Sequence, residues 1–342
     1  MHPAKHPHER ALLATIFLLN AIEFLQSGMI TFGAGPISGE IGASPEEFTL
    51  VTVAYAVVAI AAIAKQRWLV ERLGWRGFVQ ASVAVYIIGA AICGSSGSFP
   101  QFFAGRVVMA LAGGPFLTTS RIMVNLLPAN PRRFRGIVAY AGALAFGNGI
   151  APWLASVAIS HDRWPMIFVL LSGVAGGAAL FGSIALPAEA TPAAQRSQSH
   201  PQATVVMAAG AFLGLYTLQR AAYDFYSNAM PLLLAILAGG GALLYFAHHQ
   251  YRHERPLLAL KRLMHPRYVA GMATFTLGYM VLGANNYMLP AFMQGALGFP
   301  WETIGQVQSA GLLAAVPAFC VMAMILKKTS RPKSSTSPAS PC

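Results

Sequence analysis

The stretch EFTLVTVAYAVVAIAAIAKQRWLVERLGWRGFVQASVAVYIIGAAICGSSGS, residues 47–98, contains two apolar runs joined by a short basic loop. The runs, 47–64 and 77–98, are each close to the roughly 20 residues that a helix needs to cross a bilayer. The loop 65–76 carries four basic residues and a single acid. Lys and Arg collect on the cytoplasmic side of membrane proteins, so the stretch predicts a spanning helical hairpin with a cytoplasmic loop.

The composition of the whole chain extends this interpretation. Of 342 residues, 56% are hydrophobic and 10% charged, against roughly 25% charged in soluble domains. A water-soluble globule and a disordered chain are both excluded. We expect an all-α integral membrane protein with about ten transmembrane helices. The ten predicted spans are 11–33, 47–64, 77–98, 102–124, 136–160, 166–187, 203–221, 229–248, 268–292 and 303–326.

The basic residues predict the orientation of these spans. With both ends of the chain cytoplasmic, 20 of the 23 Lys and Arg residues fall on the inner side. The other three are Arg106, within a span, and Arg163 and Arg220, near outer connections. The net charge of +12 is therefore chiefly an orientation signal. It predicts contact with the lipid bilayer and no nucleic-acid partner. Three cysteines without close spacing predict no metal site.

The loop 65–76 also carries a family signature. Glu71-Arg72, Gly74 and Arg76 follow the spacing of the loop between spans 2 and 3 in the major facilitator superfamily, which this loop resembles, with Glu71 in place of the usual Asp. The resemblance implies a conformational gating loop, in which a tight turn at Gly74 brings charged groups to a neighbouring helix end. The alternative is an ordinary positive-inside loop.

Two further motifs occur in the order expected of that family. Arg106 leads a stretch ending in Gly113-Gly114 in the fourth span. In the fifth span, Gly147, Gly149 and Pro152 form a version of the motif associated with antiporters. Small residues at this spacing allow close helix contact, and a proline permits a bend. Generic helix packing is the alternative interpretation of the fifth span.

Later motifs resemble the fourteen-span drug:proton antiporter branch, including Leu289-Pro290 and Gln294-Gly-Ala-Leu-Gly298. In that branch two extra spans separate two six-span bundles. The resemblance implies a chain that is C-terminally short, with an incomplete second bundle. The implied segments are a first bundle at 1–187, a polar cytoplasmic linker at 188–202, two additional spans at 203–248, a loop and the first two helices of the second bundle at 249–326, and a disordered tail at 327–342.

Glu23 is the first candidate for transport chemistry. A charge in the middle of a span costs about 2.5–3.5 kcal/mol on insertion scales, so such a residue usually faces a polar cavity or a partner. Asn20 lies on the same helical face and Gln26 beside it. Arg106 lies at a depth that differs from that of Glu23 by only about 6 Å. We expect Glu23 to exchange a proton or bind a cationic substrate, with Arg106 paired to it. The alternatives are a structural acid and an arginine that reaches the outer interface.

Four more residues complete the predicted site. Asn285 and Asn286 in the ninth span, with Asn148 and Trp153 in the fifth, are candidates for substrate contacts. Polar side chains also hold membrane helices together, which is the alternative role.

The predicted function is that of a proton-coupled secondary active transporter, exporting drug-like or amphipathic small molecules, without cofactors and without enzymatic activity. Its predicted location is the cell's inner membrane if the organism is bacterial. The alternative is a non-transporting truncated membrane protein, or a subunit of a split transporter whose partner chain supplies the missing spans.

Overall fold

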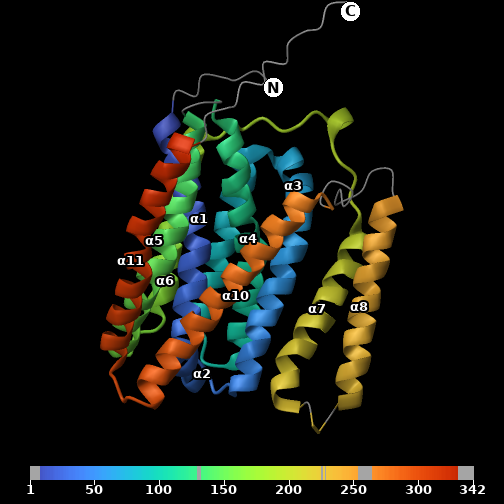
Figure 1. Ribbon diagram of the computed structural model, residues 1–342. Helices are drawn as coiled ribbons and strands as arrows, with labels where there is room; N and C mark the ends of the chain where they lie inside the picture. Colours follow the sequence, from blue (N-terminus) through green and yellow to red (C-terminus); the bar gives the residue numbers. More distant parts are fainter. Residues whose placement is uncertain (1–7, 129–131, 225, 228, 253–263, 330–342) are drawn as a thin grey trace, which may run out of the picture.

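A computed structural model describes residues 8–128, 132–224, 226–227, 229–252 and 264–329, apart from the side chains of 267, 318–320 and 322–329. This part of the chain is helical and contains no strand. Figure 1 shows the long helices standing roughly side by side. The α-helices of the described part are α1 (Glu9–Phe32), α2 (Ala34–Glu40), α3 (Pro45–Gly94), α4 (Phe99–Met123), α5 (Arg132–Ser160), α6 (Met166–Ala185), α7 (Pro201–Asp224), α8 (Ala229–Arg252), α10 (Pro266–Gly295) and α11 (Trp301–Thr329), with short turns of 3-10 helix at Val124–Leu126 and Ala193–Gln195.

Within the described residues, seven helices are long and apolar enough to cross a membrane. One of them, α3, has 50 residues and contains both predicted spans of the opening stretch. Helices α10 and α11 cover the ninth and tenth predicted spans and are 30 and 29 residues long, although neither is among the seven. The chain is therefore an integral, multi-pass membrane protein, and each predicted span coincides with helix.

The two arms of α3 are separated at Gly74. Its φ of 71° and ψ of 166° are not helical, and side chains with a Cβ rarely adopt a positive φ. A Cβ at this position would also lie 2.6 Å from the carbonyl oxygen of Ala188. The tight turn predicted for the loop is thus present, and it turns the chain back so that the second arm can join the bundle.

Helices α1, α3, α4, α5 and α6 form the first bundle, with α1 packed against α4, α5 and α6. Large side chains such as Tyr86, Phe102, Phe116 and Phe168 are fully buried in its core. Glycines let α3 and α4 approach closely. A Cβ on Gly114 would lie 2.6 Å from the Cα of Ala59. Shape-matched small residues supply the association energy that the hydrophobic effect cannot supply in lipid.

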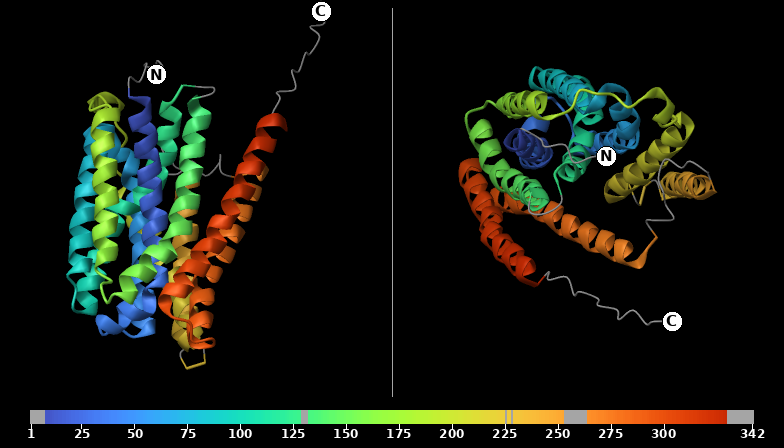
Figure 2. Two further views of the ribbon diagram at one scale, coloured as in Figure 1. Left: turned by 90° about the vertical axis from the view of Figure 1, so that its left-hand side faces the viewer. Right: turned by 90° about the horizontal axis from the view of Figure 1, so that it is seen from above.

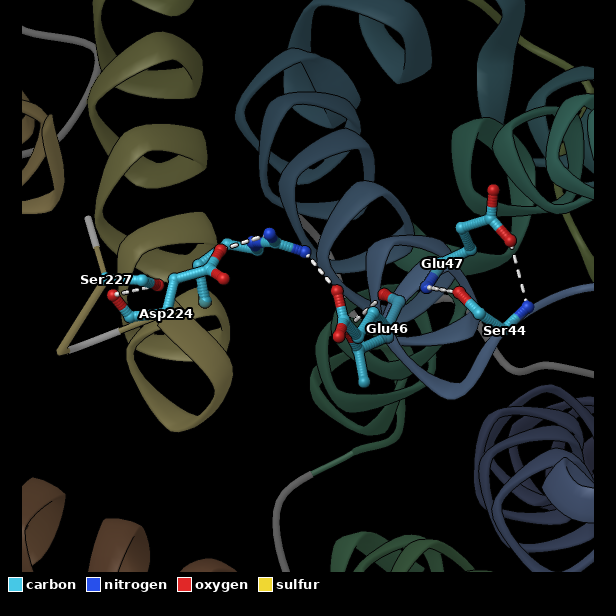
Figure 3. Close-up of polar contacts among 7 residues, drawn as sticks. Ser44, Glu46, Glu47, Asp224 and Ser227 are labelled. Atoms are coloured by element: carbon cyan, nitrogen blue, oxygen red, sulfur yellow. Dashed lines mark hydrogen bonds and ion pairs between the residues drawn. The ribbon is translucent and has the colours of Figure 1, made fainter.

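The α7–α8 pair stands beside the first bundle, with α7 packed on α3 (Figures 1 and 2). At the outer end, Arg220 of α7 donates a 2.6 Å hydrogen bond to Glu46 of α3 and pairs with Asp224. Figure 3 shows these acids, together with the capping box that Ser44 and Glu47 form at the start of α3. The charges expected near outer connections thus meet at one end of the two helices.

Helix α11 packs against α5, whereas α10 crosses obliquely and touches α1 and α11 (Figures 1 and 2). Most described side chains of α10 are exposed, among them Phe275, Val281 and Met288. An incomplete second bundle agrees with this arrangement. The predicted tail at 327–342 begins within α11, which continues to Thr329, and its remaining residues lie outside the described part of the chain. The division into five segments stays a prediction.

Candidate functional site

A network of side chains connects α1, α3 and α4 in the interior of the first bundle. Glu23 of α1 is partly exposed, and its Oε2 accepts two hydrogen bonds. One comes from the hydroxyl of Tyr55 on α3 and the other from Nε2 of Gln26, each 3.1 Å long. Both partners donate to the carboxylate, so the arrangement suits the ionised form, which only accepts hydrogen bonds.

Arg106 joins this network from α4. Its Nη1 donates a 2.8 Å hydrogen bond to Oε1 of Gln26, and its guanidinium carbon lies 4.4 Å from the centre of the Tyr55 ring. Arg106 and Gln26 are almost fully buried, with 5% and 1% of their surfaces exposed. The direct Glu23–Arg106 pair expected from depth is not formed, because the amide of Gln26 lies between the two charges. The amide accepts from the arginine and donates to the carboxylate.

Several buried polar atoms at or near this network have no hydrogen-bond partner among the described residues. They are Nε of Arg106, Oδ1 of Asn20 and the hydroxyls of Tyr86 and Tyr279. Tyr279 of α10 packs its ring against Phe24 of α1, with 6.3 Å between the ring centres. Unsatisfied polar groups in a protein interior are costly. These atoms therefore give the region capacity to bind a further polar group.

The remaining candidates are dispersed around this network. Asn20 donates a 2.6 Å bond to the carbonyl of Tyr140 on α5, which makes it a link between helices. Asn148 donates to the carbonyl oxygen of Leu144 within α5. Trp153 is 41% exposed, and its backbone N–H donates to Ser309 of α11. None of these contacts reaches Glu23.

The two asparagines of α10 differ from each other. Asn286 accepts weak bonds of 3.3 and 3.4 Å, at its side-chain and backbone oxygens, from Gln308 of α11. Asn285 is exposed. The structure thus brings Asn286 to the interface between α10 and α11, and not to the Glu23 network. The described residues contain no group of three metal-ligating side chains that could hold an ion.

The glycines of the antiporter-like motif lie at helix contacts. A Cβ on Gly147 would lie 2.8 Å from the Cβ of Phe24 on α1, and one on Gly149 would lie 2.4 Å from a methyl group of Leu313 on α11. Pro152 is buried within α5. Helix α5 therefore packs closely on α1 through one face and on α11 through another, so it joins the first bundle to the helix that follows α10.

The predicted gating loop contacts the polar linker that follows α6. Nε of Arg76 donates a 3.0 Å bond to the carbonyl oxygen of Leu186, at the end of α6 just before the linker, and Nζ of Lys65 donates a 3.0 Å bond to Oγ of Ser199 in the linker. Between them, the carboxylate of Glu71 accepts from the backbone N–H of Ser197 at 2.5 Å. The linker thus runs antiparallel to the loop. The charged groups of the loop bind this linker and the end of α6.

Charge and packing within the loop hold Glu71 and Arg72 in place. Glu71 accepts a 2.7 Å bond from Arg67, one turn earlier. Partial burial of Glu71 opposes its ionisation, but the bonds from Ser197 and Arg67 outweigh it and hold the pKa of Glu71 below its ordinary value. Arg72 lies over the Trp68 ring at 4.0 Å and donates to the Trp68 carbonyl.

Sequence reasoning did not identify Tyr55. A tyrosine within an apolar run carries no signal that separates a core ring from a hydroxyl aimed at a carboxylate. The nearest signal was Gly113 of the fourth-span motif, because a Cβ there would lie 3.0 Å from the Tyr55 hydroxyl. The glycine leaves the space that the tyrosine occupies.

Comparison with known proteins agrees with the fold and the motifs. The family model of the Major Facilitator Superfamily matches residues 16–337. The chain belongs to this superfamily. A protein of Salmonella typhi named as a multidrug resistance protein, MdtD, is 23% identical over 283 residues, and its Salmonella newport counterpart is 22% identical. Each match covers 81% of this chain and 58% of the relative, so the chain spans well under two thirds of their length.

A solved structure shares the fold of this superfamily member. The peptide transporter POT, crystallised with sulfate, superposes with a TM-score of 0.61 at 15% identity. The superposition covers 94% of this chain and 70% of the POT chain. The family is one of transporters and not of enzymes.

Proposed function

We propose that this superfamily member is a proton-coupled secondary transporter that exports amphipathic, drug-like molecules across a bacterial inner membrane. The observation that carries the proposal is the network in which the carboxylate of Glu23 is linked through Gln26 to the guanidinium of Arg106. An acid and a base held within a membrane bundle are rarely structural, because each is costly there. The multidrug resistance proteins to which the chain is similar support the substrate class.

The hydrogen bonds suggest how a proton and a cationic substrate compete for Glu23. In the ionised state Oε2 accepts from both Tyr55 and Gln26. Protonation turns the carboxyl into a donor, so at least one of these bonds must weaken or rearrange. The amide of Gln26 is bonded to Arg106 as well, so its rearrangement shifts the α1–α4 contact. A cationic substrate bound to the ionised Glu23 would exclude the proton, and a proton on Glu23 would exclude the cation. This competition is the basis of exchange.

The loop 65–76 and the linker provide the gating element in this proposal. Their bonds hold the loop between the two arms of α3 against the end of α6 and the linker, and release of these bonds would accompany the change of access. Helix α5 contacts both α1 and α11 closely through its glycines. In this proposal the first bundle and the helices that follow it would rock against each other at these contacts.

The test is transport by the purified full chain in vesicles. We expect an inward proton gradient to drive export of a fluorescent amphipathic cation, and collapse of the gradient with a protonophore to stop it. Export that persists after collapse, or no export in the presence of a gradient, would contradict the proposal.

A second candidate is a subunit whose helix α10 is covered by another chain. The exposure of most described side chains of α10 favours it. In this case the chain alone would not transport, and addition of a separately encoded four-span chain would restore proton-driven export. Transport by the chain alone would exclude the subunit role.

A further inference from the structure

A cavity of about 550 Å³ lies between the inner ends of α7 and α8, away from the Glu23 network. Its walls come from the last residues of the linker, the first residues of α7 and the final turns of α8. The lining residues are Ser199, His200, Pro201, Gln202, Ala203, Val206, Tyr245, Phe246 and His249.

The polar wall of the cavity favours an anion. His200 and His249 supply two imidazoles, and Ser199 supplies a hydroxyl that already accepts a bond from Lys65. Among the described residues that line the cavity there is no Asp or Glu. Burial lowers the pKa of the Lys65 ammonium, and an added anion nearby would offset that cost. The start of α7 contributes the positive end of a helix dipole as well.

The opposite wall favours hydrocarbon. Val206 and Phe246 lie within the predicted spans 203–221 and 229–248, whereas Ser199 and His249 lie just beyond them. The cavity therefore straddles the inner boundary of the bilayer. Tyr245 occupies the level at which tyrosine rings collect in membrane proteins. Arg252 lies in the last turn of α8, at the same boundary, and a basic residue there attracts anionic lipid.

We infer that this cavity is a binding site for one anionic phospholipid of the inner leaflet, with the phosphate at the imidazole wall and an acyl chain along the apolar wall. A phosphodiester with two long chains combines the charge and the apolar length that the two walls require. A soluble phosphate would supply the charge but not the apolar length. This inference does not depend on the proposed transport activity.

Thermal unfolding of the full chain in detergent provides the test. We expect phosphatidylglycerol to raise the midpoint of unfolding in a saturable way, because a ligand that binds the folded state stabilises it. Phosphatidylcholine and inorganic phosphate at the same concentrations should have little effect. His200→Ala combined with His249→Ala should weaken the apparent affinity for phosphatidylglycerol by about tenfold, as expected from loss of about 1.4 kcal/mol.

The chain offers a matched control in His248→Ala. His248 precedes His249 on α8, is exposed, and does not line the cavity, so its replacement removes an imidazole next to the site and should leave binding intact. Val206→Trp, which fills the cavity without changing charge, should abolish the saturable response even if the double variant fails to fold. An equal response to inorganic phosphate, or an undiminished response in Val206→Trp, would overturn the inference.

Discussion

Arg106 of α4 bonds to Gln26 of α1 at 2.8 Å, and Gln26 in turn bonds to Glu23 at 3.1 Å. The two intramembrane charges are therefore coupled through an amide that has one group for each of them. A direct ion pair would hold both charges tightly in one geometry. The relayed contact lets the carboxylate change protonation while the arginine keeps a partner.

Replacing the relay tests its contribution to stability. Gln26→Leu should lower the free energy of unfolding by about 1.5–3 kcal/mol, because it removes a hydrogen bond to a buried charged group. Denaturant unfolding in micelles measures this value. Ser27→Ala alters the next residue, which is exposed, and should change stability little. Equal effects of the two substitutions would show that the relay is not a stabilising contact.

The turn at Gly74 should tolerate no side chain. Gly74→Ala places a Cβ 2.6 Å from a backbone oxygen at a φ of 71°, and we expect a loss of about 1–3 kcal/mol from strain at this position. Gly77→Ala is the control, since the nearest atom to its Cβ would be 3.5 Å away within the helix. The unfolding midpoints of the two variants, measured under the same conditions, test this expectation. A neutral Gly74→Ala would mean that the linker does not lie against the loop.

Contact between α5 and α1 should depend on Gly147. Gly147→Ala would bring a Cβ within 2.8 Å of Phe24, so we expect a destabilisation of about 1–3 kcal/mol from overpacking. Gly142→Ala on the same helix meets nothing within 4 Å and should be neutral or slightly stabilising. The same unfolding measurement serves both, and a similar loss for each would contradict close packing at Gly147.

Docking of the linker should weaken in acid. The folded structure lowers the pKa of Glu71 below its ordinary value of 4.5. This contribution to docking is therefore fully present above about pH 4.5 and is lost as the pH falls through the lowered pKa. A nitroxide on Ala194→Cys, with Cys320 and Cys342 replaced by serine, should gain mobility only in that acidic range.

Glu71→Gln supplies the reference for the acid experiment. It should increase the label's mobility at neutral pH and remove the acid-dependent step. Glu302→Gln, at the start of α11 and far from the loop in the fold, should leave the step in place. A step that persists in Glu71→Gln would assign the pH dependence to another group.

The sequence predicted the helical class, the spans and the turn at Gly74 because each depends on local properties: apolar length, basic loops and glycine. Comparable depth placed Glu23 and Arg106 in one layer, but depth alone does not distinguish direct contact from a bridge through Gln26. Tyr55 and the linker's contact with Glu71 depend on helices and segments far apart in the chain. Such contacts leave no local pattern, so they became evident only from the fold.

The role of Glu23 is the central claim, and transport by Glu23→Gln in vesicles tests it most directly. We expect this variant to lose export driven by a proton gradient, because the neutral amide of Gln neither exchanges a proton nor attracts the cationic substrate. Glu40→Gln, at the exposed end of α2, should keep this export. Proton-driven export by Glu23→Gln at the wild-type rate would contradict the account.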